Sequence, residues 1–118
     1  MTAFPRLMGA ATLAYSLAVV ANPKVLAGPC ELVDEFGDVP ADVATAVRAV
    51  STRDAIISAL MLVAPAGPAL KAVTLTRGLC DLSDAAVFGL PASPAGRKKI
   101  AAVGGGWGAL VLLSRRWA

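Results

Sequence analysis

The sequence predicts an all-α fold, a four-helix transmembrane bundle that forms one domain over residues 1–118. Two observations predict it. First, 57% of the residues are hydrophobic and only 16% are charged, whereas an ordinary soluble domain carries about 25% charged residues. Second, the apolar residues fall into four stretches of helical length, and clusters of Pro and Gly separate them. A chain of 118 residues has room for one domain, so we expect the helices to pack into one bundle.

The first predicted helix covers residues 4–21. Arg6 is its only charge, and Asn22-Pro23 ends the stretch. Such a helix spans about 27 Å, close to the hydrocarbon core of a bilayer. A secretory signal, with residues 7–21 as its apolar region and Val25-Leu26-Ala27 as its cleavage site, is the alternative. The length of the apolar run favours the membrane helix.

Residues 22–40 form a polar connection that is broken by Pro and Gly and rich in carboxylates. Within it, Cys30–Phe36 has Leu32, Val33 and Phe36 on one side, which permits a short interfacial helix. The favoured interpretation is a solvated loop whose carboxylates serve solubility alone. These carboxylates and the one that follows the loop are Glu31, Asp34, Glu35, Asp38 and Asp42.

Three further helices are predicted over residues 41–64, 69–90 and 98–116. Residues 65–68 (Pro-Ala-Gly-Pro) separate the first two, and Pro91 and Pro94 precede the third. Cations bound the last helix, where they can snorkel to the interface beside Trp117. With four helices that cross the membrane in alternation, equal numbers of cations fall on its two sides. The positive-inside rule therefore leaves the orientation of the protein in the membrane open. One side holds Arg6, Lys71, Arg115 and Arg116, and the other holds Lys24, Arg97, Lys98 and Lys99.

The composition excludes several classes of function. The chain has no His and only two Cys, Cys30 and Cys80. It therefore lacks the commonest metal ligand and the thiolates of a zinc or iron–sulfur site, and we expect no metal and no cofactor. Its cations lie in short terminal and loop clusters without interleaved aromatic residues, so nucleic acid is not an expected partner.

The most informative pattern is a set of charges within the second and third predicted helices. Arg77, Asp81 and Asp84 lie at positions i, i+4 and i+7, on one face of a helix. Each charge at a bilayer centre costs about 2.5 to 3.5 kcal/mol, whereas an apolar residue returns only about 0.3 to 0.6 kcal/mol. This face must therefore meet protein or a wet cavity. The second helix supplies Arg48, Arg53 and Asp54, so the sequence predicts a neutral network of three cations and three anions around a small polar cavity.

Two interpretations of this network stay open. In one, it fixes the register of the helices; in the other, it marks a ligand pocket, a proton path or an acid catalyst. In a catalytic site Asp54, Asp81 or Asp84 would serve as general acid or base. The arginines Arg48, Arg53 and Arg77 would bind an anionic or carbonyl group.

Small residues indicate close helix contacts. Gly104 and Gly108 form a small-xxx-small pair, which permits packing within the chain or a homodimer. Gly9, Thr12 and Ser16 offer a facing surface of small residues on the first helix.

The sequence resembles the DUF4267 family of small bacterial and fungal integral membrane proteins. The residues that carry the resemblance are Arg48, Arg53 and Asp54 on the second helix, Arg77, Asp81 and Asp84 on the third, and Asn22-Pro23 after the first. The resemblance spans most of the chain and implies a four-helix membrane protein. It also implies an Arg-Asp pair in the second helix and an acidic residue late in the third, here Asp84. It implies no activity, and Arg77 stands outside the family's pattern.

The sequence thus predicts a multi-pass protein of the cell membrane that acts as a binding or accessory structural protein and has the lipid bilayer and a lipophilic small molecule as partners. An enzyme that performs acid/base isomerisation, cyclisation or epoxide opening on a lipophilic substrate is the alternative. Proton or ion transport would need a continuous polar path and, at this length, a dimer. A soluble helical bundle that buries its apolar faces in an oligomer is a further alternative.

Overall fold

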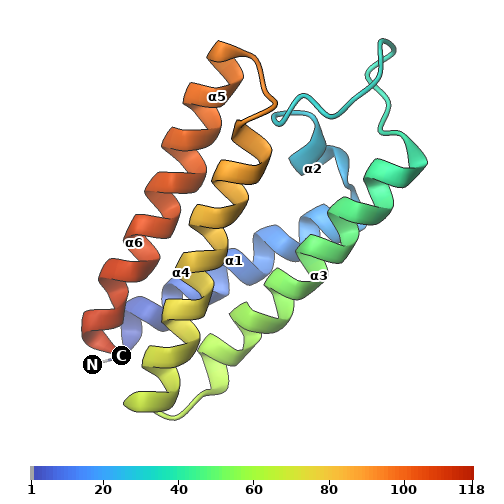
Figure 1. Ribbon diagram of the computed structural model, residues 1–118. Helices are drawn as coiled ribbons and strands as arrows, with labels where there is room; N and C mark the ends of the chain where they lie inside the picture. Colours follow the sequence, from blue (N-terminus) through green and yellow to red (C-terminus); the bar gives the residue numbers. More distant parts are fainter. Residues whose placement is uncertain (1) are drawn as a thin grey trace.

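The computed structural model describes residues 2–118, and this part of the chain is all-α (Figure 1). The three long helices α1, α3 and α4 each agree with their predicted ranges to within one residue at either end. The last predicted helix begins earlier, at Pro94, and runs without a break through four segments. The elements are α1 (Ala3–Ala21), α2 (Lys24–Ala27), α3 (Ala41–Val63), α4 (Pro68–Gly89), α5 (Pro94–Ile100), the π-helical η1 (Ala101–Gly105), α6 (Gly106–Ser114) and the 3-10 turn η2 (Arg115–Trp117).

Proline, glycine and serine set the helix boundaries. Asn22 is extended before Pro23, because a residue that precedes proline disfavours the helical conformation. Gly67 has a φ of 101° and leads directly into Pro68 at the start of α4. Ser93 caps α5, since its hydroxyl oxygen accepts the N–H of Gly96 at 3.1 Å. This cap explains why the last helix begins before residue 98.

The connection between α1 and α3 differs from one sequence interpretation. The short helix α2 lies at Lys24–Ala27, and the structure has no helix over Cys30–Phe36, so the interfacial helix considered there is wrong. Glu31 adopts a φ of 61° and Gly37 a φ of 78°, and both values interrupt a right-handed helix. This segment is a loop that runs from α2 past the α4–α5 turn to the start of α3 (Figure 1).

The helices associate as two close pairs, α1 with α3 and α4 with α6. Figure 1 shows both termini and the α3–α4 connection at one end of the molecule, with α2 and the α4–α5 turn at the other. Toward this second end α3 and α4 diverge. Glycines allow the close approach within each pair: a Cβ at Gly9 would lie 2.7 Å from the Cβ of Met61, and one at Gly78 would lie 2.5 Å from a methyl carbon of Leu112.

Two arginines bind the carboxyl ends of neighbouring helices. Arg6 donates hydrogen bonds to three carbonyl oxygens at the end of α3, those of Met61, Leu62 and Ala64, at 2.7 to 3.2 Å. Arg97 donates to the carbonyl of Leu90 at 2.9 Å, just beyond α4. The last carbonyls of a helix have no partner within it and carry partial negative charge, so a guanidinium stabilises them.

One helix of the described chain, α1, is long and apolar enough to cross a membrane. This is a weak indication of membrane association, because a signal sequence or a buried core helix has the same properties. Both α3 and α4 carry charges along their middles.

Candidate functional site

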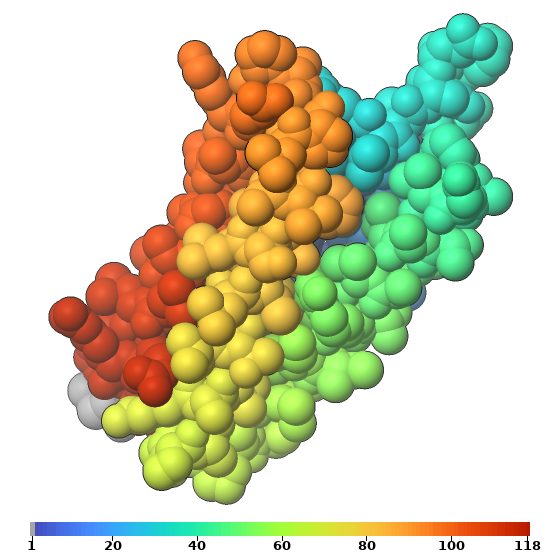
Figure 2. Space-filling model, in the orientation of Figure 1, coloured from blue at the N-terminus to red at the C-terminus, as the bar shows by residue number. Residues whose placement is uncertain are grey.

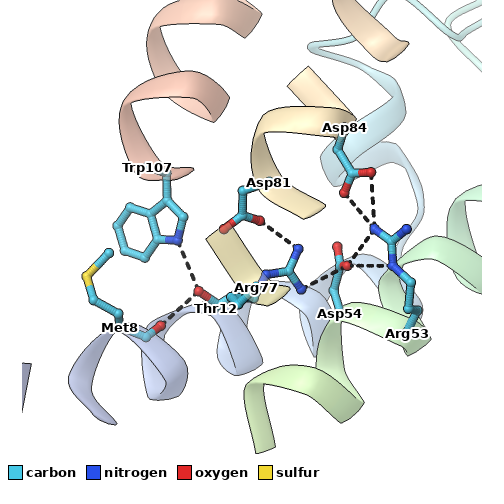
Figure 3. A network of polar contacts seen from close by, with 8 residues as sticks. All are labelled: Met8, Thr12, Arg53, Asp54, Arg77, Asp81, Asp84 and Trp107. Carbon is cyan, nitrogen blue, oxygen red and sulfur yellow. Dashed lines mark hydrogen bonds and ion pairs between the residues drawn. The ribbon is translucent and has the colours of Figure 1, made fainter. Parts of the chain in front are cut away.

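Arg77 lies at the centre of a chain of ion pairs between α3 and α4 (Figure 3). Its side chain has no exposed surface. Its Nη1 lies 2.9 Å from Oδ1 of Asp54, and its Nη2 donates to Oδ1 of Asp81 at 2.7 Å. The predicted pairing of Arg77 with Asp81, one turn apart on α4, is confirmed.

Arg53 extends this chain toward the second end of the bundle. Its Nη2 lies 2.9 Å from Oδ1 of Asp54 and 2.8 Å from Oδ2 of Asp84, so it joins the two helices a second time. Arg53 is 43% exposed, in contrast to the buried Arg77. The five side chains form a linear series, Asp84–Arg53–Asp54–Arg77–Asp81, which we call the Asp/Arg chain.

Arg48 is not part of the Asp/Arg chain, and the predicted composition of the network is wrong in this respect. Its Nε donates to the carbonyl oxygen of Val20 in α1, at 3.0 Å. Arg48 is nearly two turns away from Asp54 along α3, on the side where α3 and α4 diverge. The Asp/Arg chain therefore holds two cations and three carboxyl groups, an excess of one negative charge when all are ionised.

A cavity of about 480 Å³ adjoins the Asp/Arg chain. Its walls come from α1, α2, α3, α4, α5, η1 and α6, and most of its lining residues are apolar. Figure 2 shows the surface hollowed between α3 and α4, with α1 behind the hollow. The polar end of the cavity is formed by Asp54, Asp81 and Asp84.

Only the carboxyl groups of the Asp/Arg chain face this cavity. None of the predicted binding residues Arg48, Arg53 and Arg77 is among the lining residues of the described chain. The arginines lie behind the carboxyl groups, so an anionic ligand in the cavity would meet acceptors first. Their predicted binding role is untested, as are the acid and base roles of Asp54, Asp81 and Asp84.

Two carboxyl oxygens at the polar end lack a hydrogen bond. All ion-pair contacts of Asp54 run through its Oδ1, so Oδ2 accepts no hydrogen bond from residues 2–118. Oδ2 of Asp81 is buried and also lacks a partner among these residues. Figure 3 shows this oxygen turned away from Arg77, on the side of Trp107. Of the two, only Oδ2 of Asp81 is buried, and a buried acceptor is costly to leave unpaired.

Three aromatic side chains, Tyr15, Phe88 and Trp107, also line the cavity. The indole N–H of Trp107 donates to Oγ1 of Thr12 at 3.0 Å, and the hydroxyl of Thr12 donates to the carbonyl of Met8 at 2.8 Å (Figure 3). These bonds fix the indole against α1. The sequence did not predict the aromatic lining, because no spacing relates three residues on three separate helices. The stripe of Thr12 and Ser16 was the available signal, and both line the cavity.

Lys99 lines the cavity at the end away from Asp81. Gly104 packs on Ala85 and Gly108 packs on Asp81, which fixes the antiparallel register of the last helix against α4. In this register Lys99 lies about 9 Å beyond Asp84 along the helix axis. Lys99 is exposed and forms no ion pair within the described part of the chain.

The loop after α2 closes one side of the cavity and is attached to α5. Pro29 and Cys30 line the cavity, and the next residue, Glu31, accepts hydrogen bonds from the backbone N–H and the hydroxyl of Ser93, both at 2.7 Å. These bonds hold the pKa of Glu31 below its usual value. Burial, with a smaller effect of Glu31, raises the pKa of the Cys30 thiol. The expectation that the loop's carboxylates serve solubility alone is wrong for Glu31.

Gly104 and Gly108 face α4 of the same chain. A Cβ added at Gly104 would lie 3.1 Å from the nearest atom of α4, and one added at Gly108 would lie 3.0 Å from it. The homodimer through this pair stays a prediction.

Among residues 2–118 no group of three or more His, Cys, Asp or Glu side chains could hold a metal ion.

No protein-family model, no curated protein and no solved structure matches this chain. Its resemblance to the DUF4267 family therefore stays a prediction.

Proposed function

We propose that this chain is a small multi-pass membrane protein, a four-helix transmembrane bundle, that binds a lipophilic small molecule in the cavity beside the Asp/Arg chain. The observation that carries the proposal is the cavity itself. Its volume of about 480 Å³ lies within the usual range for ligand pockets, about 300 to 1,000 Å³, and it combines apolar walls with a few convergent polar groups.

The distribution of side chains supports the membrane location. Large apolar residues are exposed on every long helix, among them Leu7 (68%), Val63 (74%), Val87 (64%) and Val103 (68%). Most charges in the middles of α3 and α4 are turned inward instead: Arg77 has no exposed surface and the three aspartates are at most 24% exposed, although Arg53 is 43% exposed. The mean hydropathy over all residues of α3 or α4 is therefore lower than the hydropathy of its outer face alone.

The two ends of the molecule carry the remaining cations. Arg6 binds the end of α3, and Arg115 donates to the carbonyl of Lys71 near the start of α4, so these cations lie at one end. Lys24 and Arg97 lie at the other end, beside the loop and the α4–α5 turn. The longest dimension of the molecule is 47 Å, close to the thickness of a bilayer with its head groups, about 40 to 45 Å.

The unpaired acceptors favour binding over a purely structural role. A charge network that served only helix register would be expected to pair its own groups. Here Asp54 and Asp81 each keep one oxygen without a partner beside the cavity, and Nε and Nη1 of Arg77 also lack a hydrogen bond.

A second candidate function is acid/base catalysis on a lipophilic substrate, in an isomerisation, a cyclisation or an epoxide opening. Asp54 favours it, because its Oδ2 has no partner beside the cavity and a general acid or base needs an oxygen that can reach the substrate.

The multi-pass arrangement can be tested by labelling introduced thiols in sealed vesicles. Glu35→Cys lies after α1 and Ala66→Cys lies between α3 and α4, and both positions are exposed. With four spans, a membrane-impermeant maleimide added outside labels only one of the two variants, and the other reacts only after the vesicles are opened. If α1 alone crosses the membrane, both thiols react from the same side.

Ligand binding can be tested with a matched pair of substitutions on α1. Both alanines are exposed, but Ala11 lines the cavity and Ala14 is not among the lining residues. We expect small molecules that co-purify with the parent protein, analysed by mass spectrometry of the extract, to be absent from Ala11→Phe and present in Ala14→Phe. Equal amounts of small molecule in the two variants would contradict a ligand in this cavity.

A further inference from the structure

Three carboxyl groups at one side of the cavity present hydrogen-bond acceptors. Asp54, Asp81 and Asp84 line it, and two of their oxygens lack a partner. A group that satisfies these oxygens must donate hydrogen bonds. An unprotonated carboxylate or a phosphate donates none, so it would leave them unpaired and add like charge beside them.

The positive charges nearby do not reverse this preference. Arg77 is completely buried, with Nη1 and Nη2 beside Asp54 and Asp81. Its Nε and Nη1 lack a hydrogen bond, but Arg77 does not line the cavity. Arg53 directs its Nη2 at Asp54 and Asp84 and does not line the cavity. The five groups together carry an excess of one negative charge when ionised, and a single positive charge in the cavity would neutralise it.

The cavity walls can contact the apolar part of such a ligand. Tyr15, Phe88 and Trp107 place aromatic rings around the cavity, and these rings interact favourably with both apolar groups and cations. Because the indole N–H of Trp107 already donates to Thr12, it does not require a hydrogen-bond acceptor on the ligand. Lys99, at the far end, disfavours a second positive charge there and so fixes which end of the ligand lies inside.

We infer that the cavity takes a lipophilic amine, whose protonated nitrogen binds Asp81 and Asp54 at the inner end and whose apolar part extends along the aromatic walls toward Lys99. This inference rests on the proposed binding function and adds the charge and the orientation of the ligand.

Three probes of similar size and different charge test it: 1-naphthylmethylamine, 1-naphthylmethanol and 1-naphthoate. Each is titrated at pH 7 by calorimetry into the protein in a neutral detergent, and a titration into empty micelles is subtracted. We expect the amine to bind at least about tenfold more tightly than the alcohol, the effect of one charge-assisted hydrogen bond, and naphthoate to bind most weakly. Ala11→Phe should abolish binding of the amine, and Ala14→Phe should leave it unchanged.

A carboxyl variant tests the group that recognises the charge. In Asp81→Asn we expect the amine to lose most of its advantage over the alcohol. The exposed loop variant Asp38→Asn is the control and should bind like the parent.

The outcomes separate this inference from the function on which it rests. If amine and alcohol bind equally and Ala11→Phe abolishes both, the cavity binds ligands and the preference for an amine is wrong. Tightest binding of naphthoate overturns the inference in the same way. If no probe binds, or if Ala11→Phe and Ala14→Phe bind alike, the binding function is contradicted as well.

Discussion

Arg77 and Asp81 lie one turn apart on α4 and form an ion pair of 2.7 Å in which the arginine side chain is completely buried. The same guanidinium reaches Asp54 on α3 at 2.9 Å. A single arginine therefore pairs with carboxyl groups from two helices at the point where the cavity begins. Removing one member of a buried ion pair costs more than removing an exposed one, because the partner is left charged and desolvated.

Arg77→Met should accordingly lower the free energy of unfolding by about 3 to 5 kcal/mol, since it leaves two carboxyl groups without their common partner. Thermal or denaturant unfolding in detergent measures this. Arg53→Met is the matched control, and because Arg53 is 43% exposed its loss should cost no more than about 1 kcal/mol. Equal losses from the two variants would show that Arg77 is not the central group of the Asp/Arg chain.

Arg6 should stabilise the end of α3 through its three hydrogen bonds to carbonyl oxygens. Arg6→Met is expected to cost about 1 to 3 kcal/mol of stability, because a helix terminus loses both its donors and a favourable charge. Lys98→Met, at an exposed position, should have little effect under the same unfolding conditions. If Arg6→Met unfolds like Lys98→Met, the cap does not contribute.

The contact between Gly9 and α3 should not tolerate a methyl group. An added Cβ would lie 2.7 Å from the Cβ of Met61 and 3.1 Å from the carbonyl oxygen of Ser58. Gly9→Ala should destabilise the protein by about 1 to 3 kcal/mol, although alanine is the better helix former. Gly106 has no atom within 4 Å of such a Cβ, so Gly106→Ala should stabilise slightly. Differential scanning fluorimetry of both variants distinguishes them, and a stabilising Gly9→Ala would contradict this packing.

The attachment of the loop to α5 should depend on pH through Glu31. Hydrogen bonds from Ser93 lower the pKa of Glu31 in the folded protein, so the charged form is favoured there. The attachment is then complete above the ordinary pKa of a glutamate, about 4.3, and is lost as the pH falls through the lowered value. Hydrogen exchange of the Ser93 amide should increase over that range once the intrinsic effect of pH is removed.

Glu31→Gln provides the control for this measurement. The variant should exchange faster than the parent at neutral pH and show no transition in acid. A transition of the same size in Glu31→Gln would assign the pH dependence to another group.

The sequence predicts α1, α3 and α4 well because proline and glycine end them at defined residues, such as Asn22-Pro23 and Gly67-Pro68. It also predicts that Asp54, Arg77 and Asp81 avoid lipid, since the cost of exposing a charge depends on that residue alone. The partner of Arg48 could not be predicted in this way. It depends on where α3 and α4 diverge, which is a property of the packed helices.

The same reasoning explains the parts of the site that the sequence did not indicate. The contact between Glu31 and Ser93 joins residues far apart in the chain, through a left-handed backbone conformation that glutamate seldom adopts. The aromatic lining depends on the register of α6 against α4, which Gly108 allows by its close approach to Asp81. Such contacts follow from the assembled bundle and leave no periodic pattern in the sequence.

The central claim is that the Asp/Arg chain carries a surplus carboxyl group that serves a ligand. It is tested most directly by comparing the stability and the bound small molecule of Asp81→Asn and Asp54→Asn in detergent. Asp54 contacts both arginines, so Asp54→Asn should unfold several degrees earlier than the parent. Asp81→Asn leaves two cations with two carboxylates, and it should keep its melting temperature within a few degrees while losing the molecule that co-purifies with the parent. If Asp81→Asn is as unstable as Asp54→Asn and its bound small molecules are unchanged, the charges serve only to hold the helices together and the account is contradicted.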